Sequence, residues 1–98
     1  MEIRMFSAVH LDPAFRAYLE EKIGKLGKFI FDEGSAEFNL KKEGPQFISE
    51  LRIHSKHQTL FLKEQAADLN GSVELLLDKA RNKLRKAHER VIDRSHRG

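Results

Sequence analysis

The sequence predicts an α+β domain with the element order β-α-β-β-β-α, a four-stranded sheet with two helices packed on one face. Two observations lead to this prediction. Apolar residues recur at helical spacing in two segments, one between residues 13 and 30 and one from residue 73 onward. Between them, three short runs alternate apolar with polar residues and are separated by turn-forming residues.

The first strand is expected at residues 2–9, which alternate loosely, and Asp12-Pro13 then predicts the start of a helix. Asp is a preferred N-cap residue, and Pro is favoured at the first helical position because its missing N–H would have no partner there. The helix is expected to run to about Phe29, and Gly34 closes the region. Its apolar face is formed by Phe15, Leu19, Ile23, Leu26 and Ile30.

Three alternating runs follow, and their short connections predict an antiparallel meander with one buried face. Gly44-Pro45 and Ser55-Lys56-His57 supply the turns. Ile48 and Phe61 are expected on the sheet face away from the helices. The residues expected to face the core are, run by run, Ala36, Phe38 and Leu40, then Phe47, Leu51 and Ile53, then Leu60 and Leu62.

The last helix is expected to begin at a cap, either Asp68 or Asn70, and to continue to about Asp93. We interpret residues 1–94 as a single domain and residues 95–98 as a disordered tail. The apolar stripe of this helix consists of Val73, Leu76, Leu77, Ala80, Leu84, Ala87 and Val91.

The composition indicates a soluble globular protein of the reducing cytoplasm. Of the 98 residues, 40% are hydrophobic and 34% are charged, and none is cysteine, so disulfides, thiolate nucleophiles and cysteine metal sites are excluded. No apolar run approaches the roughly 20 residues that a membrane span requires. The N-terminus also lacks the basic and apolar regions of a secretory signal.

No catalytic or metal-binding constellation is present in the sequence. His54 and His57 stand three positions apart without a nearby third ligand, so we interpret them as surface residues. Asp12 and Asp68 are accounted for as caps, and the serines lack the context of an activated nucleophile. We therefore expect neither an enzyme nor a protein with a metal, a cofactor or a small-molecule substrate.

Positive charge is concentrated at the C-terminal end. Residues 1–78 carry ten Lys or Arg against thirteen Asp or Glu, a balance of −3, whereas residues 79–98 carry eight against two, a balance of +6. This asymmetry indicates a polyanionic partner, either nucleic acid or an anionic membrane.

The basic residues of the last helix form two rows beside its apolar stripe. The first row consists of Lys79, Lys83, Lys86 and Arg90. The second consists of Arg81, Arg85 and His88, and the acids Glu74, Asp78 and Glu89 lie closer to it. Because a solubilising face normally mixes both signs of charge, we interpret the acid-free first row as the binding surface and the second row as a weaker contributor.

Lys22, Lys25 and Lys28 add a third set of cations on the first helix. Alone, this set would be an ordinary solvated face, because Glu21 and Lys25 form a standard i,i+4 pair. If the two helices lie side by side on the sheet, the first-helix lysines and the first row are expected to border one groove. Six or seven cations on one side of a small domain suit a phosphate backbone.

Several of these residues resemble the ribosome hibernation-promoting factor family in its short form, which includes the ribosome-associated inhibitors. The most specific part is Asp68-x4-Val73-Glu74-x3-Asp78-Lys79, and Lys22-x-x-Lys25-Leu26 matches the first-helix pattern. Lys86 and Arg90 fall on basic positions of the family. The chain departs from the family at Asn70, where a Tyr is usual, and at Gly71-Ser72, where the family has Ala-Ala.

The resemblance implies a protein that binds rRNA of the small ribosomal subunit where mRNA and tRNA would sit, and so blocks translation in resting cells. We expect the free protein to be a monomer. Two alternatives stay open. One is an RNA-binding module of the double-stranded-RNA-binding type, which the predicted fold resembles. That type places a lysine cluster at the start of its last helix, where this chain has none. The other is a protein-interaction domain, which would bind an acidic partner or self-associate through the open face of the sheet.

Overall fold

The computed structural model describes residues 1–56 and 58–97. Its elements confirm the predicted order. They are strand β1 (Glu2–Ser7), helix α1 (Pro13–Lys25), the short 3-10 helix η1 (Leu26–Phe29), strands β2 (Ser35–Glu43), β3 (Gln46–His54) and β4 (Thr59–Ala66), and helix α2 (Leu69–Arg97).

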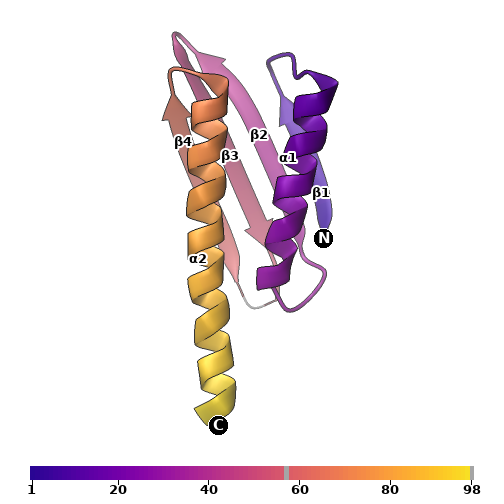
Figure 1. Ribbon diagram of the computed structural model, residues 1–98, viewed down its shortest axis with the longest axis vertical. Coiled ribbons are helices and arrows are strands. Elements are labelled where there is room, and N and C mark those ends of the chain that lie inside the picture. Colours follow the sequence, from indigo (N-terminus) through magenta and orange to yellow (C-terminus); the bar gives the residue numbers. More distant parts are fainter. Residues whose placement is uncertain (57, 98) are drawn as a thin grey trace.

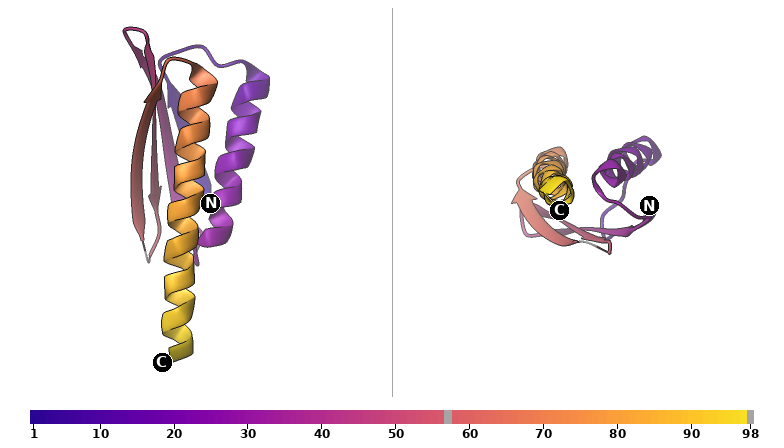
Figure 2. Two further views of the ribbon diagram at one scale, coloured as in Figure 1. Left: turned by 60° about the vertical axis from the view of Figure 1, so that its left-hand side comes forward. Right: turned by 90° about the horizontal axis from the view of Figure 1, so that it is seen from below.

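The four strands form one sheet in the order β1-β2-β3-β4. Strands β1 and β2 are parallel, so the chain must cross back between them, and α1 makes this connection. The β2–β3 and β3–β4 pairs are antiparallel and are joined by short turns. Both helices lie on the same face of the sheet, α1 over β1 and α2 over β3 and β4, as predicted (Figures 1 and 2).

The core lies between this face and the two helices. In the strand register, Met5, Phe38, Leu51 and Leu62 form one row across the sheet. Phe38 and Leu51 are fully buried in it. The apolar stripes of α1 and α2 cover the row, with Leu19, Ile23, Val73, Leu76 and Ala80 fully buried.

The helix ends differ in detail from the predictions. Asp12 occupies the N-cap position of α1 but makes no side-chain capping bond, although its carbonyl accepts a hydrogen bond from the Arg16 N–H at 2.9 Å. The first helix changes from α to 3-10 geometry at Leu26, between Gly24 and Gly27, because glycines weaken α-helical continuity.

Helix α2 begins directly after Asp68, whose carbonyl accepts from the Ser72 N–H at 3.2 Å, so Asp68 rather than Asn70 precedes the helix. The helix also extends to Arg97 instead of ending near Asp93. Residues 95–97, assigned from the sequence to a disordered tail, therefore belong to α2. Gly98 lies outside the described residues.

The far face of the sheet carries Ile48 and Phe61, as expected from the alternation. The Phe61 side chain is half exposed, and the Arg52 guanidinium lies 5.3 Å from its ring centroid. Ile48 is nevertheless buried, at 2% exposure. Its register neighbours are Lys41 on β2 and Gln65 on β4, long side chains that can cover it.

Candidate nucleic-acid interface

The two basic rows of α2 point in opposite directions across the domain. The apolar stripe of α2 faces the sheet, so one flank of the helix turns toward α1 and the other toward β4, the edge strand beneath it (Figure 2). Arg81 lies on the α1 side, in a groove with the first-helix lysines. Lys83, Lys86 and Arg90 lie on the β4 side.

This arrangement corrects the prediction that the first-helix lysines and the Lys79 row share one groove. The groove between α1 and α2 has a volume of about 140 Å³. Its charged lining residues are Lys22, Lys25, Lys28 and Arg81 together with Glu74 and Asp78. The prediction was wrong because the helical spacing shows that a row flanks the apolar stripe but does not show which neighbouring element that flank will meet.

Carboxylates neutralise part of the charge in this groove. Lys25 Nζ lies 3.2 Å from Glu21 Oε1, and Arg81 Nη2 lies 3.7 Å from Asp78 Oδ1. The other two lysines lie over aromatic rings. Lys22 Nζ is 5.6 Å from the centroid of the Tyr18 ring, and Lys28 Nζ is 5.1 Å from the centroid of the Phe29 ring. The groove is therefore of mixed charge.

Tyr18 connects the two helices across the groove. Its hydroxyl donates a hydrogen bond to Glu74 Oε1 at 2.6 Å. This bond, and after it desolvation and the negative charge of Glu74, raises the pKa of Tyr18 above its ordinary value of 10.0. Tyr18 therefore stays a neutral donor at physiological pH.

The second basic row is also partly used in packing. The His88 ring stacks on Phe31, with centroids 4.6 Å apart and planes at 5°, and meets Phe29 edge-on at 6.3 Å. His88 is half-buried in this cluster, whereas Arg85 is exposed. The row is thus less available to a polyanion than its sequence pattern suggests.

On the β4 side, a hollow of about 480 Å³ lies between α2 and the strand. It holds three exposed cations, Lys83, Lys86 and Arg90. Within residues 1–56 and 58–92, none of these three forms an ion pair with a carboxylate. The other lining residues are Gln58, Thr59, Leu60, Leu84 and Ala87.

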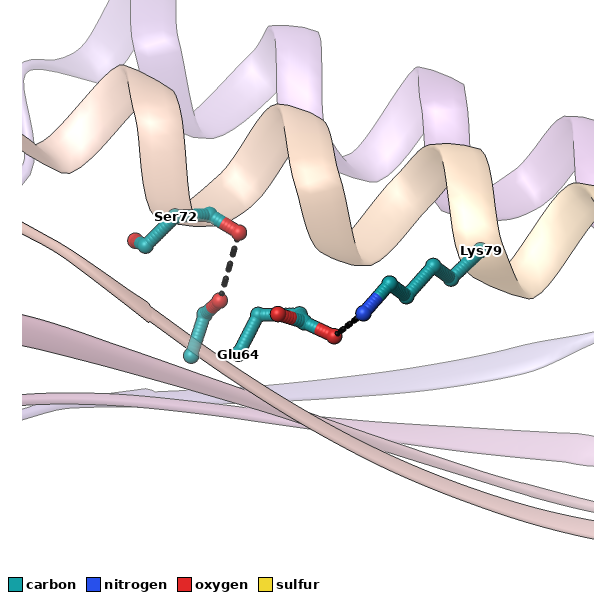
Figure 3. Close-up of polar contacts among 4 residues, drawn as sticks. Glu64, Ser72 and Lys79 are labelled. Atoms are coloured by element: carbon teal, nitrogen blue, oxygen red, sulfur yellow. Dashed lines mark hydrogen bonds and ion pairs between the residues drawn. The ribbon is translucent and has the colours of Figure 1, made fainter.

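Lys79 differs from the rest of its row, because its ammonium group forms an ion pair with Glu64 of β4 (Figure 3). The prediction that this row contains no neutralising acid is therefore wrong at Lys79. It considered only residues of the helix itself. The sequence did hold a signal, since Glu64 continues the inward alternation of Leu60 and Leu62, and an inward-facing carboxylate needs a partner.

Two buried serines fix the start of α2 to the sheet near this ion pair. Ser49 Oγ donates to the Ser72 carbonyl at 3.0 Å (Figure 3). Ser72 Oγ donates in turn to the Leu69 carbonyl at 3.0 Å. Both serines are fully buried. Sequence reasoning had assigned them no role, although Ser49 stands at an inward position of β3.

The described residues show what surrounds His54 and whether metal-ligating side chains gather. His54 Nδ1 lies 3.2 Å from Thr59 Oγ1, and His57 lies outside the described residues. In the part of the chain that the structure describes, no three His, Cys, Asp or Glu side chains gather as a metal ion would require. Likewise, no helix of that part is long and apolar enough to cross a membrane.

Comparison with known proteins places this geometry in a family. Residues 5–92 match the family model described as Sigma 54 modulation protein / S30EA ribosomal protein. The chain belongs to this family. The S30EA match covers α1, most of α2 and most of the sheet, and it confirms the resemblance to hibernation-promoting factors that the α2 motif indicated.

A curated relative and two solved structures extend the comparison. The ribosome hibernation promotion factor of Lactococcus lactis subsp. cremoris is 33% identical over 86 residues, which are 85% of this chain and 46% of that protein. The chain thus spans about half the length of this S30EA relative.

The Thermus thermophilus Protein Y N-terminal domain superimposes with a TM-score of 0.78 at 20% identity, covering 88% of this chain and 98% of that one. For a ribosomal subunit interface protein from Coxiella burnetii, the TM-score is 0.72 at 23% identity, with coverage of 88% and 96%. At these identities the two structures establish the S30EA fold of this chain and nothing more.

Proposed function

We propose that this chain binds the small ribosomal subunit where mRNA and tRNA would lie, and thereby keeps the ribosome inactive. The names of its relatives, a hibernation promotion factor and a subunit interface protein, support a ribosomal partner. The observation that carries the proposal is the run of Lys83, Lys86 and Arg90 along one flank of α2, which no described carboxylate neutralises.

The mechanism is steric and electrostatic and requires no catalytic group. Phosphate contacts of rRNA would hold the domain in place without reading base sequence. Once held, a body of about 50 × 21 × 17 Å would obstruct the path of mRNA and tRNA. On this proposal the protein acts in the cytoplasm, where ribosomes work.

The two flanks of α2 make different contributions. The β4 flank provides the principal phosphate contacts because Lys83, Lys86 and Arg90 are exposed and form no ion pair with a carboxylate of residues 1–56 and 58–92. The groove between the helices provides a weaker second surface, since the ion pairs of Lys25 and Arg81 must loosen before those cations meet phosphate. Two basic surfaces on opposite sides of one helix suit a partner that surrounds the domain, such as a channel in the subunit.

Competition with mRNA and tRNA tests the location. Small subunits are sedimented with the protein, alone or after loading with a short mRNA and tRNA. We expect co-sedimentation with empty subunits and loss of the protein from loaded ones. Simultaneous binding of all components would contradict the channel location while leaving ribosome binding intact.

A plain RNA duplex distinguishes the proposal from a module of the double-stranded-RNA-binding type. The first turn of α2, residues 70–74, contains no lysine or arginine, so it offers no cluster for the phosphates across a duplex groove. We expect duplex affinity far below that for small subunits. Equal affinity would favour the duplex-binding alternative.

A further inference from the structure

The hollow between α2 and β4 differs from two other hollows of the surface in both size and charge. The groove between the helices is smaller, about 140 Å³, and contains Glu74 and Asp78. A larger depression beside β1 and β2, of about 850 Å³, includes Glu50, which lies 3.8 Å from Lys41. Of the three, only the α2–β4 hollow combines cations with a lining that contains no carboxylate.

The volume of this hollow is sufficient for a small organic ligand. Ligand sites typically enclose about 300–1,000 Å³, and the value of about 480 Å³ lies within that range. The groove between the helices, at about 140 Å³, falls below this range. Size therefore favours the α2–β4 hollow over the groove between the helices, and its lining without carboxylates favours it over the depression beside β1 and β2.

The floor of the hollow is apolar, which simple phosphate binding does not require. Leu84 is buried at 1% exposure, and Leu60 and Ala87 are half-buried beside it. Ala87 is small, so it leaves room above the helix surface. Gln58 and Thr59 add an amide and a hydroxyl to the lining. The amide nitrogen of Gln58 donates to the Phe29 carbonyl at 3.4 Å and the Thr59 hydroxyl lies 3.2 Å from His54 Nδ1, so a base edge would meet the remaining hydrogen-bonding capacity of each group.

We propose that this hollow holds one unstacked nucleotide of single-stranded RNA, with its base against the apolar floor and its flanking phosphates at Lys83, Lys86 and Arg90. The inference rests on the proposed function, because it names the kind of RNA element that the β4 flank of α2 would take on the ribosome. A base paired within a duplex remains stacked and cannot enter, whereas bases of loops and single strands can turn outward.

Two RNA hexamers test the base contact with the unmodified protein. One is a uridylate hexamer and the other an abasic hexamer with the same number of phosphates. Burying roughly 50 Å² of base surface corresponds to roughly a tenfold gain in affinity, so the uridylate hexamer should bind about tenfold more tightly at low salt. Equal affinities would overturn the proposal.

Ala87→Leu tests the location, because it fills the hollow, preserves every charge and retains good helix propensity. The matched control is Ala17→Leu, which makes the same change at an exposed position of α1. We expect Ala87→Leu to remove the preference for uridylate without changing affinity for the abasic hexamer, and Ala17→Leu to change neither. A preference that survives in a folded Ala87→Leu protein would place the base elsewhere and overturn the site.

Sedimentation with small subunits, run in parallel, separates this inference from the proposed function. Subunit binding without any hexamer preference would leave the proposed function standing and overturn the nucleotide site. Hexamer preference without subunit binding would support the site and overturn the ribosomal proposal.

Discussion

Gly34 and Gly44 share a left-handed backbone conformation but have different surroundings. Their φ angles are +59° and +57°. A Cβ atom at Gly44 would meet nothing within 4 Å, whereas one at Gly34 would lie 2.5 Å from Ile30 Cδ1 and 3.1 Å from the His54 carbonyl oxygen. Substitution of Gly44 therefore measures the free-energy cost of the left-handed conformation alone. Substitution of Gly34 adds the cost of a steric clash.

We predict that Gly44→Ala lowers the free energy of unfolding by about 1 kcal/mol, the cost of a left-handed conformation for an L-residue. Gly34→Ala should lower it by at least about 1 kcal/mol more, because the contacted backbone oxygen cannot withdraw easily. Denaturant unfolding of both variants measures the difference. Equal losses would mean that the chain between η1 and β2 relaxes around the added methyl group.

Glu64 reduces the charge that α2 presents, because it holds Lys79 in an ion pair. The Glu64 side chain is 17% exposed and that of Lys79 is 54% exposed, so the pair resembles a surface salt bridge worth about 0.2–1 kcal/mol. We predict that Glu64→Gln strengthens binding to small subunits by up to about fivefold, because Lys79 is released toward phosphate.

The control for Glu64→Gln is Glu89→Gln, which makes the same change of charge at an exposed position of α2. It should strengthen binding less, through the long-range field alone. Affinities come from co-sedimentation at low salt. Equal gains for both variants would mean that the pairing of Lys79 has no specific effect on binding.

Helix α2 brings the fold and the interface together, because one stripe packs on the sheet while two flanks carry cations. We predict that the double variant Lys83→Glu, Lys86→Glu weakens binding to small subunits at least about a hundredfold, since two phosphate contacts are lost and repulsion replaces them. The matched variant Arg81→Glu, Arg85→Glu should lose only about tenfold, because Arg81 is already paired with Asp78. Co-sedimentation at constant salt compares the two.

Both double variants should stay folded, because exposed substitutions usually cost within about 0.5 kcal/mol each. Circular dichroism and thermal unfolding verify this before binding is compared. If the Arg81 variant loses as much as the Lys83 variant, the assignment of the principal face to the β4 flank is wrong. If neither loses binding, α2 presents only a solvated face.

The elements were predictable from the sequence because their periods are local properties. The spacing from Leu19 to Ile30 and the alternation of Ala36, Phe38 and Leu40 each require only neighbouring residues, and burial confirms both. The direction of a helix flank is not local. Whether Lys79 faces α1 or β4 depends on how α2 is set on the sheet, and its partner Glu64 lies 15 residues away in the chain.

The whole molecule is elongated, and its net charge is unevenly distributed along the chain. Helix α2 has 29 residues, a length of roughly 43 Å, and its C-terminal part projects beyond the sheet (Figure 1). This projecting part belongs to the segment from residue 79 onward, which carries the balance of +6, while the remainder carries −3. Such a body would be oriented by the field of a polyanion before contact.

The salt dependence of binding follows from this distribution of charge. On α1, η1 and α2, six of the proposed cations form no ion pair with a described carboxylate: Lys22, Lys28, Lys83, Arg85, Lys86 and Arg90. If about six phosphates are neutralised, affinity for small subunits should fall roughly a thousandfold between 50 and 200 mM salt, because each contact releases condensed counterions. Co-sedimentation across this range gives the slope, and the Lys83→Glu, Lys86→Glu variant should show a slope smaller by about two contacts. Affinity that hardly changes with salt would mean that apolar or neutral contacts dominate, and the protein-interaction alternative would then be favoured over a phosphate-bound factor.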